Sequence, residues 1–118
     1  MALQRTTTSP FEPVFSRYAG AIPLPYLRAL AYKESGFRPD IIHPTSRATG
    51  LFQITTPALQ GFNVKSGTAH SLANLVSPDL NTRVAVSHLT SVINGYRRLR
   101  EAPAPVESPG LERAAMLL

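Results

Sequence analysis

Cysteine is absent from this chain of 118 residues. Its absence excludes disulfide bonds, thiol nucleophiles and the sulfur ligands that most structural zinc sites use. Long apolar runs are absent too, and none approaches the ~20 residues that a membrane-spanning helix needs. The first ten residues hold one basic residue and no apolar stretch, so they do not form a secretory signal peptide.

Acidic residues are scarce: 7 stand against 12 lysines and arginines, which gives a net charge of +5. A basic surface suits an anionic polymer, either nucleic acid or an acidic cell wall, although small proteins also carry such charge for solubility alone. Nucleic-acid binding needs a clustered basic face, and only Arg97, Arg98 and Arg100 cluster. We therefore expect no nucleic-acid partner.

The three histidines are His43, His70 and His88, and they are far apart in the sequence. They lack the paired spacing on one helix that is typical of a metal site. We therefore expect neither a metal ion nor a cofactor.

Helical signals dominate the chain, and no strand pattern is convincing, so the predicted fold class is mainly α. Proline near the start and apolar residues at helical spacing mark each main helix. Residues 77–79 supply a serine cap, a first-turn proline and an acid for the longest one. We predict helices over residues 11–19, 23–35, 78–100 and 111–118.

The remaining segments contain glycine, proline and serine, as loops do. We predict a flexible arm over 1–10, followed by one domain over 11–118. Within the domain the connections are a long loop over 36–54, a short helical turn over 57–60 that ends at Gly61, a loop over 63–76 with a helical turn near 70–75, and a stiff linker over 102–105.

The helix over 23–35 carries a carboxylate at the end of its apolar face. Leu27, Leu30, Ala31 and Glu34 stand at i, i+3, i+4 and i+7, so they share the face that should point into the core. Burial and the negative end of the helix dipole both disfavour the charged form of a carboxylate there. A carboxylic acid that is partly protonated near neutral pH is what a general acid requires. Glu34 is therefore a candidate general acid, but on these features alone the alternative, a solvated residue at a helix end, is favoured.

Three sequence blocks in order resemble a known family. They are ESGFRP at 34–39, PTSRATGLFQ at 44–53 and SPDLN at 77–81. The pattern is similar to the soluble lytic transglycosylases, which have a lysozyme-like fold, and the resemblance covers about residues 22–100. The second block looks most like the phage-associated branches of that family.

The resemblance implies a peptidoglycan lytic transglycosylase. Such enzymes cleave the β-1,4 bond between N-acetylmuramic acid and N-acetylglucosamine and leave a 1,6-anhydro-muramyl end. One glutamate, here Glu34, protonates the leaving oxygen and then deprotonates the muramyl 6-hydroxyl, while the 2-acetamido group of the substrate stabilises the intermediate. No second carboxylate is required. The alternatives are a hydrolytic lysozyme of the same fold and a glycan-binding domain with little or no activity.

Five residues are candidates for substrate contact, each with a structural alternative. Gln53 stands where the family has a substrate-contacting glutamine, but its amide could instead stabilise the loop. Gly50 would allow a close approach to sugar or an unusual dihedral angle, and Phe52 could line the cleft or belong to the core. His43 stands where the family has a serine. Alternatively, the loop has a one-residue insertion and Ser46 supplies the serine hydroxyl, and we favour this alternative.

The resemblance also has a gap. The family's Ala-Tyr-Asn-x-Gly block, with a tyrosine near the catalytic glutamate, is missing, and the chain ends inside the predicted helix 111–118. We therefore expect a truncated domain with reduced activity and self-association through this apolar helix. Its substrate would be peptidoglycan glycan strands in the periplasm or cell wall. The domain itself would be part of a phage particle or of a larger secreted protein. Asn81, in the third block, is expected to be structural.

Overall fold

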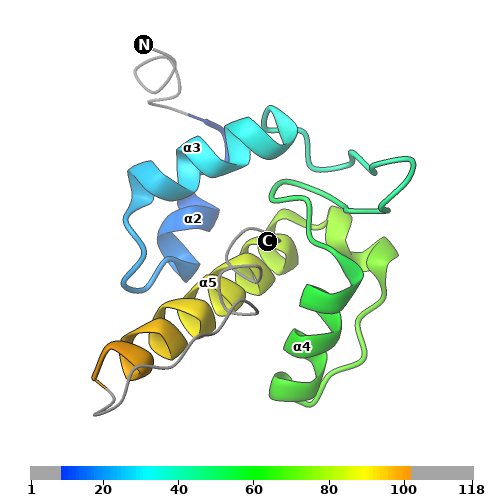
Figure 1. Cartoon of the computed structure of the whole chain (residues 1–118). Helices are drawn as coiled ribbons and strands as arrows, with labels where there is room; N and C mark the ends of the chain where they lie inside the picture. The colour runs from blue at the N-terminus through cyan, green and yellow to red at the C-terminus, as the bar shows by residue number, and fades with distance from the viewer. Residues whose placement is uncertain (1–8, 102–118) are drawn as a thin grey trace.

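The computed structural model describes residues 9–101, and helices form its architecture (Figure 1). Pairing of extended segments within this range is limited to two isolated bridges, Ile42 with Thr49 and Thr49 with Ile54. The mainly α fold class is confirmed. The predicted linker over 102–105 and helix over 111–118 lie outside the described residues. The elements are α2 (Glu12–Tyr18), α3 (Leu24–Ser35), α4 (Thr56–Ser66), the 3₁₀-helix η1 (Leu72–Val76) and α5 (Pro78–Glu101).

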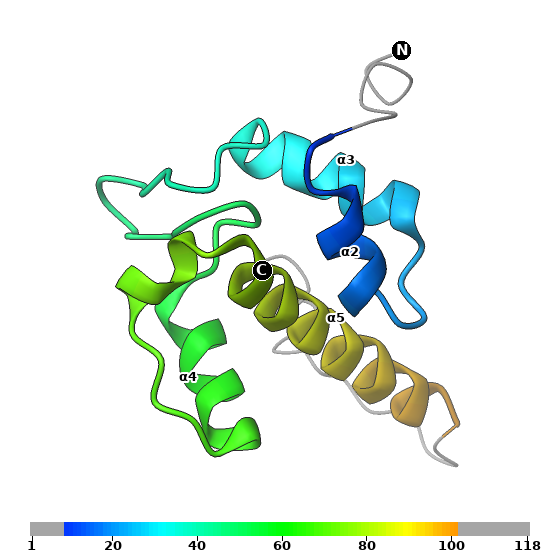
Figure 2. The ribbon, with the colours of Figure 1, turned by 180° about the vertical axis from the view of Figure 1, so that it is seen from behind.

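Helix α5 is the axis of the domain. Helix α2 packs against it on one side, α4 and η1 pack on the other, and α3 packs against α2 (Figures 1 and 2). The first half of α5 turns Leu80, Val84, Ala85 and Leu89 into the core. Its start is capped as the sequence predicts, because Oγ of Ser77 accepts a hydrogen bond from the N–H of Leu80 at 3.4 Å.

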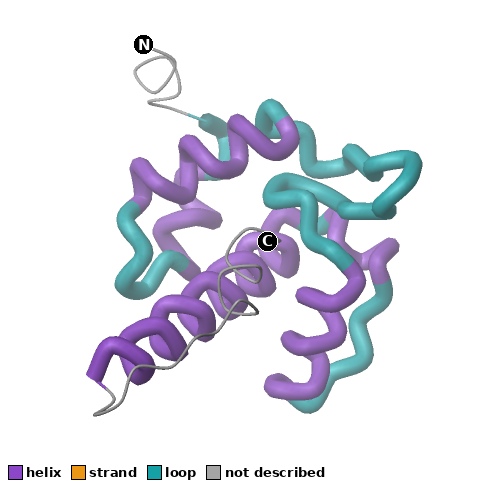
Figure 3. The backbone as a smooth tube through the Cα atoms, viewed as in Figure 1, coloured by secondary structure: helices purple, strands orange, loops and turns teal. Residues whose placement is uncertain are grey.

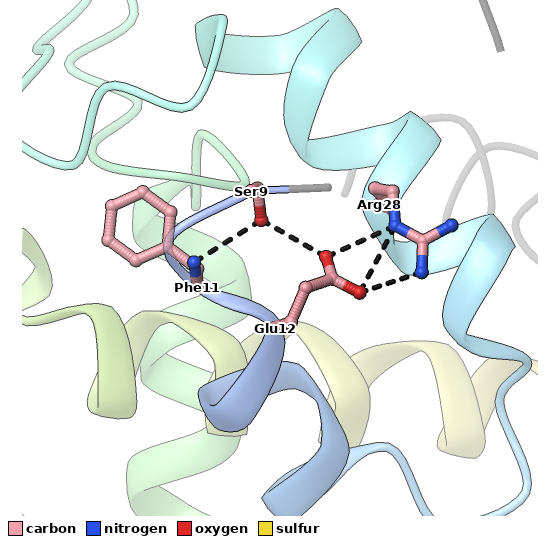
Figure 4. Close-up of polar contacts among 4 residues, drawn as sticks. All are labelled: Ser9, Phe11, Glu12 and Arg28. Atoms are coloured by element: carbon pink, nitrogen blue, oxygen red, sulfur yellow. Dashed lines mark hydrogen bonds and ion pairs between the residues drawn. The ribbon is translucent and has the colours of Figure 1, made fainter. Parts of the chain in front are cut away.

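An ion pair holds α2 to α3 (Figure 4). Nη2 of Arg28 lies 2.6 Å from Oε1 of Glu12, and Nε of Arg28 donates to both carboxylate oxygens at 3.1 Å. Ser9 donates from its hydroxyl to the same carboxylate at 3.1 Å. Ser9 lies at the end of the predicted arm over 1–10, and residues 1–8 of that arm lie outside the described residues.

Helix α4 corrects the predicted turn over 57–60. The helix runs from Thr56 to Ser66, and Gly61 lies inside it. The helix ends at Gly67, which adopts the left-handed conformation at φ 67° and donates its N–H to the carbonyl of Asn63. A glycine inside a helix costs about 1 kcal/mol relative to alanine. Burial of Ala58, Leu59 and Phe62 on the inner face of the helix outweighs that cost.

The segment over 36–54 is a long loop, as predicted (Figure 3). Its last part, residues 48–54, is buried. Leu51, Phe52 and Ile54 are fully buried and belong to the same core cluster as Leu27 and Ala31 of α3. The loop folds back on itself, since the N–H of Gly50 donates to the carbonyl of Ile41 at 2.8 Å. The second sequence block therefore forms part of the core beside α3.

Candidate active site

Glu34 stands in the last turn of α3, and its two following neighbours fix that turn. Ser35 is buried and donates its hydroxyl to the carbonyl of Ala31 at 3.0 Å. Gly36 ends the helix in the left-handed conformation at φ 63°, and its N–H bonds to the carbonyl of Tyr32 at 2.8 Å. The sequence Glu-Ser-Gly thus places a carboxylate on a helix end of defined geometry.

The expectation that Glu34 is buried is wrong, because its side chain is exposed. The buried residues of α3 are Leu27, Ala31 and Ser35, which follow one another at i, i+4 and i+8. At 3.6 residues per turn, Glu34 lies about 60° round the helix from Ala31, the middle of that face. Glu34 therefore borders the apolar stripe, and the described residues leave it open to water.

The acidic residues of the described segment fall into paired and unpaired groups. Glu12 is bound by Arg28, and this guanidinium holds the pKa of the Glu12 carboxyl below its ordinary value. Asp79 forms an exposed ion pair with Arg17 at 3.2 Å. Glu34 and Asp40 are exposed, and the side chain of neither forms a hydrogen bond or an ion pair with another described residue.

Asn81 anchors the second sequence block to α5. Its side chain is fully buried, and Oδ1 accepts a hydrogen bond from the N–H of Phe52 at 2.9 Å. Nδ2 donates to the carbonyl of Thr49 at 2.8 Å and to that of Leu75 at 2.9 Å. One amide therefore joins the loop, η1 and α5, which gives Asn81 the structural role that was expected.

The position of the Asn81 side chain requires a glycine at position 50. At φ 83° it adopts a backbone conformation that side chains rarely tolerate, and a Cβ there would collide with Nδ2 of Asn81. The unusual dihedral angle, one of the two roles considered for Gly50, is present. The other role, close approach to a sugar, stays a prediction.

Phe52 also belongs to the core and not to a cleft. It is fully buried, and its ring packs edge-on against Phe15 of α2 with 5.6 Å between centroids. An alternation of apolar and polar residues could not reveal this, since the residues from Ala48 to Ile54 are all buried, with the polar Thr49 and Gln53 among them. Of the two roles considered for Phe52, the core role is the one that the described residues show.

Gln53 is 9% exposed and sits in the left-handed conformation at φ 51°. Its Nε2 donates to the carbonyls of Ile41 at 3.2 Å and Gly50 at 3.1 Å. The loop-stabilising role is thus present. The carbonyl oxygen of the side chain forms no hydrogen bond with another described residue, so one polar atom of Gln53 is unused by the fold.

His43 and Ser46 lie at the exposed tip of the loop and serve the same turn. Nδ1 of His43 accepts hydrogen bonds from the N–H groups of Thr45 and Ser46, both at 3.2 Å. The hydroxyl of Ser46 accepts one from the N–H of Ala48 at 3.3 Å. His43 and Ser46, the two alternatives for the family serine, therefore lie in the same turn.

The histidines do not gather in the described segment. His43 is at the tip of the loop, His70 packs its ring against Phe62 at 6.2 Å, and His88 is on α5. Residues 9–101 contain no group of three histidine, aspartate or glutamate side chains that could hold a metal ion.

One contact across three helices has no signal in the sequence. The guanidinium of Arg83 on α5 lies over the ring of Tyr18 at 5.9 Å and over that of Phe62 at 5.7 Å. It therefore ties α2 and α4 to α5 by cation–π contacts on the surface. Only the assembled fold brings these three residues together.

Comparison with known proteins identifies relatives of the chain. Residues 15–105 match the family described as the transglycosylase SLT domain. Membrane-bound lytic murein transglycosylase F of Aliivibrio fischeri (strain ATCC 700601 / ES114) is 30% identical over 83 residues, which is 70% of this chain and 15% of that protein. No solved structure matches the chain. Among the described helices of this chain, none is both long and apolar enough to cross a membrane.

Proposed function

The chain belongs to the transglycosylase SLT domain family, and from this premise we propose that it cleaves peptidoglycan glycan strands with Glu34 as the only catalytic acid and base. The scissile bond is the β-1,4 bond between N-acetylmuramic acid and N-acetylglucosamine, and the product carries a 1,6-anhydro-muramyl end. Glu34 protonates the leaving oxygen and then accepts the proton of the muramyl 6-hydroxyl. Atoms balance without water, because the substrate's own hydroxyl closes the ring.

The observation that carries the proposal is the unpaired carboxylate of Glu34. A residue that transfers protons to and from a substrate must be accessible and free of a competing ion pair. Glu12 and Asp79 are bound by arginines, whereas Glu34 is exposed on a helix end that Ser35 and Gly36 hold in place. A glycan bound over this end of α3 would itself exclude water from the carboxylate, which favours its protonated form.

The loop beside α3 supplies the second support. Gln53 is held in a left-handed conformation, which costs about 1 kcal/mol for a residue other than glycine, and such strain is often found at functional sites. Its side-chain carbonyl oxygen is not used by other described residues. That oxygen can accept a hydrogen bond from a sugar hydroxyl or acetamido N–H, which fits a substrate-orienting role.

The test is muropeptide release from purified sacculi by the full chain, with products identified by mass. The anhydro product lacks the one water that a hydrolytic lysozyme adds, so mass separates these two reactions. Glu34→Gln removes the proton transfers, and we expect its release rate to fall by a factor of about 10³ or more. Asp40→Asn is the matched control, because Asp40 is also exposed and unpaired; we expect it to keep the parent rate.

Other outcomes select other functions. Equal loss in both variants would indicate a two-carboxylate glycosidase, in which the acids act across one bond. Binding of sacculi without turnover in the parent chain would indicate a glycan-binding domain. The proposed chemistry uses no metal, so treatment with a chelator should leave the rate unchanged. A substrate in the cell wall also places the domain outside the cytoplasmic membrane, in the periplasm or in an extracellular particle.

A further inference from the structure

Helix α3 carries a line of side chains that ends at Glu34. Tyr26, Leu30 and Glu34 stand four residues apart, so they form one ridge along the surface of the helix. Tyr26 is 51% exposed, and Leu30 is partly buried because it packs against the core cluster. The hydroxyl of Tyr26 forms no hydrogen bond with another described residue. The Glu34 carboxylate is therefore the polar end of a largely apolar ridge.

Helix α2 lies on the opposite side of α3 from this ridge. Arg28 reaches from α3 to Glu12 of α2 (Figure 4). At 3.6 residues per turn, Arg28 points about 160° away from both Tyr26 and Leu30. Figures 1 and 2 show α3 at the edge of the domain, with α2 beside it. The helix that packs against α3 therefore does not cover the ridge.

We propose that Tyr26 is a stacking platform for a sugar ring of the glycan strand that Glu34 cleaves, an inference that rests on the proposed function. Tyr26 and Glu34 are eight residues apart, which is about 12 Å along the helix. A β-1,4-linked sugar, whose single bonds are about 1.5 Å long, adds about 5 Å to a strand. The ring over Tyr26 is therefore about two sugars away from the scissile bond.

The chemistry of the ridge suits a sugar. In a β-1,4-linked glycan the ring C–H groups point to the two faces of each pyranose, whereas the hydroxyl and acetamido groups point outward around its edge. An aromatic ring presents a flat face with negative electrostatic potential, which packs against such C–H groups. Single exposed apolar residues are common on protein surfaces. The alignment of Tyr26 with Glu34, and not its exposure alone, therefore carries the inference.

Tyr32 offers a matched comparison on the same helix. It is 49% exposed, nearly the same as Tyr26, but it points about 160° away from Glu34. Its ring lies against that of Phe37, with 5.5 Å between centroids. A strand that follows the ridge to Glu34 does not reach this side of the helix. The two tyrosines thus share residue type and exposure and differ in their position relative to Glu34.

Calorimetric binding of a peptide-free octasaccharide of alternating N-acetylglucosamine and N-acetylmuramic acid tests the proposal in the full chain. Every variant also carries Glu34→Gln, so that the oligomer is not cleaved. We expect Tyr26→Ala to raise the Kd by about three- to tenfold, which corresponds to one aromatic contact. Tyr26→Phe keeps the ring, so its Kd should stay within about twofold of the Glu34→Gln chain, as should that of Tyr32→Ala.

Kinetics in the chain with Glu34 intact give a second measurement. Stacking far from the reacting bond is equally strong in the ground state and the transition state. Tyr26→Ala should therefore raise the KM for the octasaccharide and leave kcat unchanged, whereas Tyr32→Ala should change neither. Far-UV circular dichroism and urea unfolding check that each variant folds as the parent does.

Four results would overturn the proposal. They are an unchanged Kd for Tyr26→Ala, an equal rise for Tyr32→Ala, a rise for Tyr26→Phe as large as that for Tyr26→Ala, and no binding by the Glu34→Gln chain. Failure of the proposed function gives a different result. The Glu34→Gln chain would then cleave the oligomer, while the contrast between Tyr26→Ala and Tyr32→Ala would remain in KM.

Discussion

Gly50 and Asn81 are in contact at the centre of the domain, and each requires the other's identity. The bare Cα of Gly50 leaves the space that the Asn81 amide occupies, and a Cβ there would also stand 2.5 Å from the carbonyl oxygen of Leu75. The amide then bonds to the loop on both sides of Gly50. The second and third sequence blocks are thus one structural unit, which holds the loop that carries Gln53.

The first prediction concerns two glycines. Gly50→Ala should lower the free energy of unfolding by about 3 kcal/mol or more, since it adds both a collision and a strained φ. Gly61→Ala is the matched control: it lies inside α4, and a Cβ there meets nothing within 4 Å. This change should raise the free energy of unfolding by about 0.5–1 kcal/mol. Urea unfolding measures both, and similar values for the two variants would contradict the account of Gly50.

Asn81→Ala tests the anchor directly. It leaves the N–H of Phe52 and the carbonyls of Thr49 and Leu75 without this partner, and each buried unsatisfied group costs about 1–3 kcal/mol. We expect a loss of about 3–5 kcal/mol in the free energy of unfolding. Asn94→Ala, an exposed change on the same helix, should stay within about 0.5 kcal/mol of the parent. A small loss for Asn81→Ala would mean that water replaces the amide at little cost.

Local signals in the sequence predicted α2, α3 and α5 to within two residues at each end, because proline, glycine and serine mark their ends. They failed for α4, where Gly61 looks like a stop. The apolar spacing of Ala58, Leu59 and Phe62 was the stronger signal, since burial decides whether a helix tolerates glycine.

The sequence names candidate residues for the site, but it could not predict their surroundings. Glu34 differs from the buried face of α3 by only about 60° of rotation, which spacing alone does not resolve. The roles of Gly50 and Phe52 depend on contacts with Asn81 and Phe15, residues that lie 31 and 37 positions away. Such contacts exist only in the assembled core, so a single sequence cannot assign them.

The ion pair of Glu12 and Arg28 should make stability depend on pH. The pKa of Glu12 is lowered in the folded chain, chiefly by its hydrogen bond from Arg28. The contribution is therefore fully present above the ordinary carboxyl pKa of about 4.3, and it is lost as the pH falls through the lowered value. Glu12→Gln should be about 1 kcal/mol less stable than the parent at pH 7.

As the pH falls through the lowered pKa of Glu12, the two stability curves should converge, because the parent then also loses its charged carboxylate. Asp79→Asn is the comparison, since its pair with Arg17 is 57% and 49% exposed and solvent screens it. That variant should differ less from the parent at pH 7. A gap between the parent and Glu12→Gln that persists unchanged into acid would show that the charge of Glu12 does not stabilise the fold.

The last prediction separates the two roles of Gln53. Gln53→Met keeps the length of the side chain but removes both donations from Nε2 and the free carbonyl oxygen. Thr49→Val is the control, because Thr49 is 1% exposed and loses only its hydroxyl bond to the carbonyl of Arg47. Both variants should lose about 1–2 kcal/mol of stability.

Assayed at a temperature where both are folded, Gln53→Met should release muropeptides about tenfold more slowly at limiting substrate, as expected for one lost hydrogen bond to the sugar. Thr49→Val should match the parent rate. If the two variants release muropeptides equally fast, Gln53 acts on the loop alone, and the substrate-orienting role is wrong even if Glu34 proves essential.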